Sequence, residues 1–196
     1  MPRLILASSS PRRRELLASI GLEFDAIPSN VPEIHDGTET PEAYVRRLSL
    51  AKADEVGHRY PDRWVVGADT IVLLGDEILE KPDGEAGACR MLASIAGKTH
   101  IVYTGVTLRR VEDDYSDTRV AASEVTMLPL SEREIAWYAA TGEPLDKAGA
   151  YAVQGVGAMF IEAINGSYTN VVGLPLSILF QMLGAAGIDP LTKRAG

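Results

Sequence analysis

The chain has few of the residues that a disulfide-stabilised or zinc-binding protein needs. Among its 196 residues are one cysteine, Cys89, and three histidines. A single cysteine excludes an internal disulfide and is typical of the reducing cytoplasm, where we expect this protein to be located. So few cysteines and histidines argue against a zinc cluster. Any bound metal is therefore expected to be a hard cation held by carboxylates.

Positive charge is also scarce. Nineteen Lys and Arg residues stand against 27 Asp and Glu residues, which gives a formal net charge of −8. Binding to nucleic acid or to an anionic membrane requires a positive field over a broad surface, so we expect neither as a partner. A site for an anionic ligand would have to be built locally.

Long apolar runs and the common nucleotide-binding fingerprints are missing as well. No window approaches the length of a membrane span, and the apolar part of MPRLILASSS is too short for a secretory signal. The glycine-rich stretch lacks the pattern G-x-x-x-x-G-K-[ST], and GVGAMFIEAING is no Rossmann fingerprint. The sequence therefore supports neither a P-loop NTPase nor a dinucleotide-dependent dehydrogenase.

What the sequence does contain is a regular alternation of helix and strand patterns. With 46% hydrophobic and 23% charged residues it is an ordinary globular composition, and the length favours one α/β domain over residues 1–196. The patterns predict helices at 11–20, 41–60, 85–95, 132–141 and 175–186, the last one buried nearly all round. They predict strands at 64–79, with a turn at Gly75-Asp76, at 100–111 and 119–128 around an acidic loop, and on both sides of an Asn165-Gly166 turn.

The segment ASSSPRRRELL places three arginines where a helix begins. Ser10 is a good N-cap and Pro11 suits the first helical position, so the arginines at 12–14 fall in the first turn. A helix N-terminus already carries partial positive charge, which makes cations unfavourable there. The arginines either face solvent and surface carboxylates or bind an anion.

An anion such as phosphate suits this position. The free N–H groups of a helix start attract phosphate, and the hydroxyls of Ser8 and Ser10 add donors. Arginine offers the planar pair of donors that phosphate oxygens accept. Because consecutive helical residues point about 100° apart, we assign Arg12 and Arg13 to the ligand and Arg14 to solvent.

Asp69 lies inside the otherwise apolar strand pattern WVVGADTIVLL. A buried carboxylate is costly unless it meets a cation or several hydrogen-bond donors. The candidates are loop N–H groups, Mg²⁺, or one of two lysines. Lys81 follows the hairpin in ILEKP, and Lys52 lies on the apolar line of the helix at 41–60. Glu33, in VPEIHD, is by default a surface residue.

Taken together, several segments resemble the Maf family, nucleoside triphosphate pyrophosphatases once described as septum-formation inhibitors. The similar segments span nearly the whole chain in the family's order: LASSSPRRRELL, EAYVRRLSLAKA, VVGADTIV, ILEKP, THIVYTGV, GEPLDKAGAYAVQG and INGSYTNVVGLPL. The resemblance implies an α/β fold of the Maf and ITPase kind, with a mixed central sheet flanked by helices and two lobes around an active-site cleft. It also implies cleavage of a nucleoside triphosphate to the monophosphate and pyrophosphate, with a divalent metal cation, Mg²⁺ or Mn²⁺, as cofactor.

The resemblance also implies roles for individual residues. The phosphate-binding residues would be Ser8, Arg12, Arg13 and Lys52. Glu33 and Asp69 would hold metal and water, with Asp69 as the proton acceptor, and Lys81 would stabilise developing charge. These roles agree with the needs of phosphoryl chemistry, which depends on positioning and on neutralising negative charge.

Three positions resemble the branch of the family that acts on dTTP and UTP. They are Arg12 after Ser-Pro, Thr70 after Asp69, and Gln154 in YAVQG; the branch that acts on 7-methyl-GTP tends to have Trp, Gln and Glu there. The amide of Gln154 both donates and accepts, as the O4–N3–O2 edge of uracil or thymine requires. Thr70 and Gln154 are thus expected to bind the substrate.

Two other functions stay open at this point. One is a non-catalytic nucleotide-binding regulator of cell division, which would need the cationic residues but not the water-activating carboxylates Glu33 and Asp69. The other is a nucleotidyltransferase, which would release pyrophosphate only when a sugar phosphate is present. A homodimer is also left open.

Overall fold

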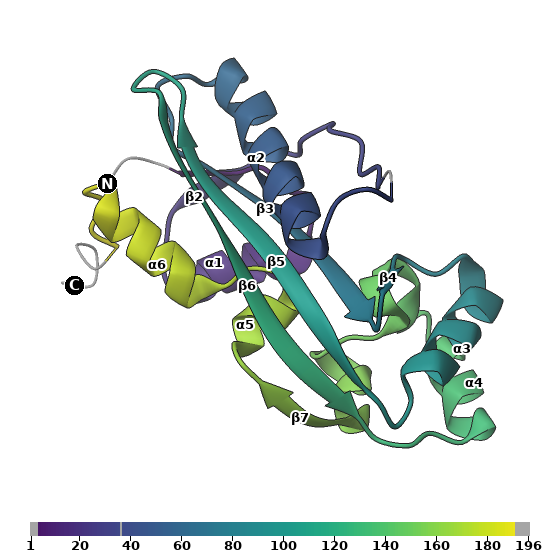
Figure 1. Cartoon of the computed structure of the whole chain (residues 1–196). Helices are drawn as coiled ribbons and strands as arrows, with labels where there is room; N and C mark the ends of the chain where they lie inside the picture. The colour runs from purple at the N-terminus through teal and green to yellow at the C-terminus, as the bar shows by residue number, and fades with distance from the viewer. Residues whose placement is uncertain (1–3, 36, 191–196) are drawn as a thin grey trace. The chain divides into compact units, whose positions relative to one another are not determined.

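The computed structural model describes residues 4–35 and 37–190, which form two compact units. The first unit contains the chain up to Asp69, the segment Thr104–Ala121, and the chain from Gly173 on. The second unit contains Thr70–Tyr103 and Ala122–Val172. Strands β3, β5 and β6 contribute residues to both units (Figure 1).

The sheet is mixed, as the sequence predicted. Its strands are β1 (Leu4–Leu6), β2 (Phe24–Ala26), β3 (Val65–Leu74), β4 (Glu77–Leu79), β5 (Thr99–Arg110), β6 (Tyr115–Met127) and β7 (Ile161–Asn165). Their order is β2-β1-β3-β5-β6-β7, and β4 pairs with β3. The pairs β1–β2 and β1–β3 are parallel, whereas β3–β4 and β6–β7 are antiparallel. The expected Gly75-Asp76 turn joins β3 to β4.

The helices of the first unit are α1 (Pro11–Ser19), α2 (Pro41–Arg59) and α6 (Leu176–Ala185). The expected Ser10 cap of α1 is confirmed, and Thr40 caps α2 in the same way. Ser10 accepts a hydrogen bond from the N–H of Arg13, and Thr40 accepts one from the N–H of Ala43. These caps satisfy donors that have no partner inside a helix, and so they fix where α1 and α2 begin.

Helix α2 packs very closely on the first unit's part of the sheet. A Cβ added at Gly67 of β3 would collide with the carbonyl oxygen of Ser49, and one at Gly105 of β5 would collide with that of Val45. Glycine therefore allows backbone to touch backbone at both places. The residues buried around this contact include Ala53 and Val56 of α2. The buried face of α2 is thereby fixed against the strand that carries Asp69.

The second unit has its own core. It contains α3 (Gly84–Ile95), α4 (Glu132–Ala140), α5 (Tyr168–Val172) and three short 3-10 helices, η1 (Glu143–Asp146), η2 (Ala148–Ala150) and η3 (Gly155–Phe160). Helices α3 and α4 lie side by side (Figure 1). A capping box between Ser131 and Glu134 is present at the start of α4. Buried side chains of this core include Leu92, Tyr138 and Phe160.

Three sequence-based expectations about elements were wrong. The Asn165-Gly166 turn leads into α5 rather than a second strand, because Ser167 accepts a hydrogen bond from the N–H of Asn170 and so begins a helix. The acidic loop is shorter than expected, since β6 already begins at Tyr115. Helix α6 buries one face only: Leu179 is buried, but Phe180 is 52% exposed. Among the described residues, no helix is both long and apolar enough to cross a membrane.

Candidate functional site

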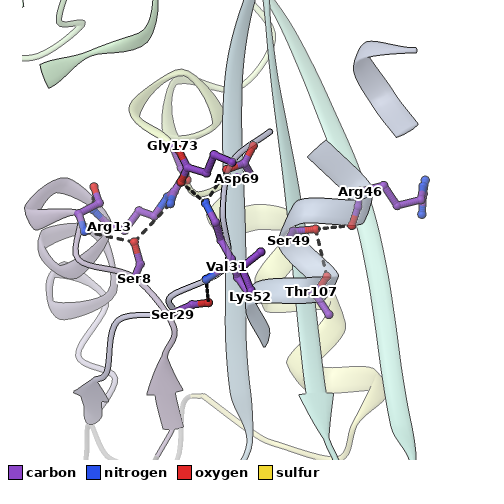
Figure 2. A network of polar contacts seen from close by, with 12 residues as sticks. Ser8, Arg13, Ser29, Val31, Arg46, Ser49, Lys52, Asp69, Thr107 and Gly173 are labelled. Atoms are coloured by element: carbon purple, nitrogen blue, oxygen red, sulfur yellow. Dashed lines mark hydrogen bonds and ion pairs between the residues drawn. The ribbon is translucent and has the colours of Figure 1, made fainter. Parts of the chain in front are cut away.

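The turn between β1 and α1 directs Arg13 toward two oxygen atoms of the first unit. Its Nε donates to the carbonyl oxygen of Gly173 at 2.7 Å, and its Nη1 donates to Oγ of Ser8 at 3.3 Å. Figure 2 shows the Arg13 side chain extending between these two partners. The buried hydroxyl of Ser8 also accepts a hydrogen bond from the N–H of Ser10 at 3.2 Å. Ser8 and Arg13, both expected to bind phosphate, are thus brought together.

The three arginines differ in exposure as the helix geometry predicts. Arg12 and Arg13 are half-buried, whereas Arg14 is exposed and donates to the carbonyl oxygen of Ser9 at 3.2 Å. Arg14 therefore points to solvent, as expected. The binding of an anion by Arg12 and Arg13 stays a prediction.

Lys52 joins the two carboxylates that the sequence singled out. Its Nζ lies 2.6 Å from Oδ1 of Asp69 and 2.5 Å from Oε1 of Glu33. The side chains of Lys52 and Asp69 are only 8% and 7% exposed, whereas that of Glu33 is 51% exposed. Figure 2 shows the Lys52 ammonium directed at Asp69. Lys52 is thus the one of the two candidate lysines that pairs with Asp69.

The local structure explains why this pair forms. Asp69 lies in the middle of β3, a strand that is largely buried. Lys52 lies on the buried face of α2 together with Val45, Leu48 and Val56. A lysine on such a face usually extends its ammonium to solvent, but here the ammonium meets Asp69 instead. The close packing of α2 on the sheet thereby supplies the countercharge that a buried carboxylate needs.

Charges of both signs meet at this place in the first unit. Burial lowers the pKa of the Arg13 guanidinium below its usual value; the negative charges of Asp69 and Glu33 oppose this shift, and the charge of Arg12 adds to it. Arginine stays protonated at neutral pH all the same. The cluster of Arg12, Arg13, Glu33, Lys52 and Asp69, which we call the charged cluster, therefore offers cations to bind an anion and carboxylates to accept a proton.

The charged cluster contains two carboxylates of the kind that bind a divalent cation. In the described part of the chain, no group of three or more His, Cys, Asp or Glu side chains is arranged to hold a metal ion. Glu33 and Asp69 do converge on one atom, the Nζ of Lys52. Mg²⁺ commonly takes one or two protein carboxylates and completes its shell with phosphate oxygens and water. Glu33 and Asp69 could thus supply the carboxylates of such a site, and metal binding by this pair stays a prediction.

Three predicted site residues belong to the second unit. Thr70 follows Asp69 in β3 and is half-buried. Lys81 follows β4 and is exposed, and Gln154 precedes η3 in an extended conformation and is half-buried. The roles of these three residues at the charged cluster stay predictions.

Gly173 is a part of the site that sequence reasoning missed. Its carbonyl oxygen holds the guanidinium of Arg13 from 160 positions further along the chain. A backbone acceptor has no side-chain signature, so no pattern in the sequence could indicate it. Its effect is to orient Arg13 over Ser8.

Comparison with known proteins identifies the family of the chain. The family described as Maf-like protein is matched over residues 3–186, which is nearly the whole chain. The chain belongs to the Maf-like protein family. The resemblance inferred from the motifs is therefore confirmed.

Similar proteins of known name cover the chain almost completely. A protein of Syntrophus aciditrophicus (strain SB) is 47% identical over 185 residues, which is 94% of this chain and 90% of the relative. A protein of Symbiobacterium thermophilum (strain DSM 24528 / JCM 14929 / IAM 14863 / T) is also 47% identical, with full coverage of both chains. Both are named dTTP/UTP pyrophosphatase. The second alignment, which covers the full chain, includes the whole charged cluster.

A solved structure with much lower sequence identity has a similar fold. The Staphylococcus aureus Ham1 protein aligns with 94% of this chain and 99% of its own, with a TM-score of 0.53 and 10% sequence identity. At this identity the likeness concerns the fold alone. It supports the mixed α/β class inferred from the sequence.

Proposed function

We propose that this protein is a nucleoside triphosphate pyrophosphatase that hydrolyses dTTP and UTP to the monophosphate and pyrophosphate. The observation that carries the proposal is the contact of the buried Asp69 with Lys52, beside Glu33 and the arginines of α1. In a Maf-like chain, whose relatives at 47% identity are named dTTP/UTP pyrophosphatase, this cluster has the composition that hydrolysis of a triphosphate requires.

The cationic side chains of the cluster would bind the triphosphate. Arg12, Arg13 and Ser8 lie at the N-terminus of α1, where the helix dipole also favours phosphate. A bound anion relieves the repulsion between neighbouring guanidinium groups. Lys52 adds a further positive charge from α2. These groups would position the substrate and neutralise charge that develops on its phosphates.

The carboxylates would handle the attacking water. Asp69 would accept the proton as the water oxygen attacks the α-phosphorus and the bond to the pyrophosphate breaks. Glu33, which is exposed and shares Lys52 with Asp69, would orient that water. Lys81 would stabilise negative charge on the leaving pyrophosphate. The ammonium of Lys52 supplies the countercharge of the buried Asp69 carboxylate.

A divalent cation, Mg²⁺ or Mn²⁺, would be held by Glu33 and Asp69. When bound, it neutralises phosphate charge and polarises a phosphoryl oxygen. The triphosphate would supply further oxygen ligands and negative charge for this cation, since Mg²⁺ commonly completes its shell with phosphate oxygens.

Selection of the base would depend on Gln154 and Thr70. The Gln154 amide can donate to one oxygen of uracil or thymine and accept from its N3–H, whereas cytosine presents a different edge. A site built on hydrogen bonds rejects a mismatched base because buried groups are left without partners. We therefore propose a pyrimidine-selective site for dTTP and UTP.

The test is a panel of nucleoside triphosphates incubated with Mg²⁺ or Mn²⁺, with pyrophosphate and monophosphate measured together. The proposal expects both products in equal amounts, fastest from dTTP and UTP, with no added sugar phosphate. Binding without products would favour a nucleotide-binding regulator. Products that form only after addition of a sugar phosphate would favour a nucleotidyltransferase, and 7-methyl-GTP as the best substrate would overturn the assignment to dTTP and UTP.

A further inference from the structure

In the second unit, two side chains hold the backbone on both sides of Gln154. The hydroxyl of Tyr138 in α4 donates a hydrogen bond to Oε2 of Glu143 at 2.6 Å. The same hydroxyl accepts a hydrogen bond from the N–H of Ala152 at 3.0 Å. Tyr138 is fully buried. This hydroxyl therefore links Glu143 to the backbone two residues before Gln154.

Glu143 holds the backbone after Gln154. Its Oε1 accepts from the N–H of Val156 at 3.0 Å, and its Oε2 accepts from the N–H of Gly157 at 2.9 Å. Gly155 has a φ of +75°, and a Cβ there would collide with the Glu143 carboxylate. Only glycine lets the chain pass so close to this side chain. We call Tyr138 and Glu143, with the N–H groups they hold, the loop clamp.

The loop clamp is built on hydrogen bonds to a charged acceptor. Burial alone raises the pKa of Glu143, but the hydrogen bonds from Tyr138, Gly157 and Val156 and the charge of Lys147 together lower it below the usual value. Glu143 is therefore ionised at neutral pH. Hydrogen bonds to an ionised acceptor are shorter and stronger than those between neutral groups.

These hydrogen bonds restrain the backbone of Gln154. Its backbone is extended, with φ −106° and ψ 158°, and lies between the anchored N–H groups of Ala152 and Val156. A side chain whose backbone is held on both sides has less freedom to re-aim its amide. Discrimination by hydrogen bonds depends on such restraint, because a mobile amide can adapt to the wrong base edge.

We infer that Tyr138 and Glu143 are positioning residues for base selection, acting through the backbone that carries Gln154. This inference rests on the proposed function and extends it to residues that need not touch the nucleotide. The loop clamp fixes the amide so that uracil and thymine are favoured over cytosine.

The experiment uses Tyr138→Phe and Glu143→Gln, with UTP and CTP as substrates that differ at the base edge. The phenylalanine ring keeps the edge-on contact with Phe160, whose ring centre is 5.4 Å from that of Tyr138. We expect the ratio of kcat/KM for UTP over CTP to fall at least about fivefold in each variant, mainly through a higher KM for UTP. The kcat for UTP should change by less than about twofold, because the charged cluster is unaltered.

The matched control is Glu134→Gln. Glu134 also accepts hydrogen bonds from a hydroxyl and a backbone N–H, both of Ser131, but it caps α4 and is no part of the loop clamp. Its variant should keep the UTP-to-CTP ratio of the wild-type enzyme. Melting temperatures of all variants show how much each substitution costs in stability.

Amide hydrogen exchange provides a readout that does not depend on activity. The N–H groups of Ala152, Val156 and Gly157 should exchange faster in the two clamp variants than in wild-type protein and in the Glu134→Gln control. Faster exchange with an unchanged UTP-to-CTP ratio would overturn the inference, since the clamp would then be structural only. Unchanged exchange would overturn it too. A wild-type protein that cleaves neither nucleotide would instead overturn the proposed function itself, together with any role in base selection.

Discussion

Lys52 and Asp69 form a buried ion pair in which Nζ lies 2.6 Å from Oδ1. Each residue alone would be unfavourable at its position, because a charge inside a protein must meet an opposite charge or several hydrogen bonds. The pair holds α2 and β3 together by more than apolar contacts, and it leaves Glu33 as the exposed third member. Stability and the proposed chemistry therefore depend on the same atoms.

Asp69→Asn should remove the proton acceptor while leaving a side chain of the same shape. A positioned acid–base group typically contributes about 10²–10⁴-fold to a rate, so kcat for dTTP should fall at least roughly 10²-fold. The melting temperature should fall as well, because Lys52 loses a charged partner. Loss of one carboxylate also relieves repulsion between Asp69 and Glu33, but the ammonium that contacts both carboxylates makes this gain the smaller effect.

The control for this substitution is Asp25→Asn. Asp25 pairs with Arg63 at 3.1 Å in the same unit, and both side chains are partly exposed. This variant should keep the wild-type turnover. An Asp69→Asn enzyme that melts lower but turns over at the wild-type rate would argue for a purely structural Asp69.

Lys52→Met should be among the most destabilising single substitutions in the first unit. It removes the ammonium that Asp69 and Glu33 share, and removal of one partner from a buried pair typically costs about 3 kcal/mol or more. Urea unfolding at neutral pH measures this loss. The exposed Lys98 provides the matched control, since Lys98→Met should change the unfolding free energy by less than about 0.5 kcal/mol. Equal effects of the two substitutions would contradict the importance of the pair.

Arg13→Ala should weaken nucleotide binding, whereas Arg14→Ala should not. Arg13 is half-buried and oriented by Gly173 and Ser8, but Arg14 is exposed. We expect the KM for dTTP to rise at least about tenfold for Arg13→Ala, in keeping with the loss of a charge-assisted hydrogen bond to phosphate. Arg13→Lys should not restore binding, because an ammonium lacks the planar pair of donors. If Arg13→Ala and Arg14→Ala had the same KM as wild-type enzyme, the phosphate-binding assignment would fail.

The parts of the site that could be predicted are those with local signals. Ser10 and Pro11 mark the start of α1 in the sequence, and helix geometry alone separates Arg14 from Arg12. Asp69 is conspicuous because a carboxylate interrupts an apolar strand. In each case the signal lies within one turn or one strand, so no knowledge of distant contacts is needed.

Other parts depend on contacts between distant segments and could not be derived from such signals. Lys52 and Lys81 were equal candidates for Asp69, and the choice depends on how α2 packs against Gly67. The role of Gly173 depends on a backbone oxygen. The start of α5 was missed because an Asn-Gly pair usually signals a hairpin turn, whereas here the following Ser167 begins a helix.

Gln154→Glu should reduce the preference for UTP. A carboxylate accepts hydrogen bonds but cannot donate one, so an oxygen of uracil loses its donor while the N3–H keeps an acceptor. We expect kcat/KM for UTP to fall roughly tenfold or more and that for CTP to change less. Gln181→Glu is the matched control, because Gln181 is exposed on α6, where it accepts from Arg119. An unchanged UTP-to-CTP ratio in Gln154→Glu would exclude Gln154 from base recognition.

His100 should make the protein less stable as the solution becomes acidic. Its side chain is buried, with Nε2 2.8 Å from the hydroxyl oxygen of Tyr151, and burial lowers its pKa to about 4. In the unfolded chain the pKa of histidine is about 6.5. Between these two values the unfolded chain binds more protons than the folded protein, so the unfolding free energy decreases as pH falls from about 6.5 to about 4. The loss attributable to this one residue is about 3 kcal/mol.

Urea unfolding between pH 7.5 and pH 4.5 tests this expectation with His100→Gln, which removes the titrating group. That variant should be less stable than wild-type protein at pH 7, because Tyr151 loses its partner, but its unfolding free energy should depend less on pH. His58→Gln is the control, since the side chain of His58 is 62% exposed, and it should keep most of the wild-type slope. The same slope in His100→Gln as in wild-type protein would show that carboxylates alone cause the loss of stability in acid.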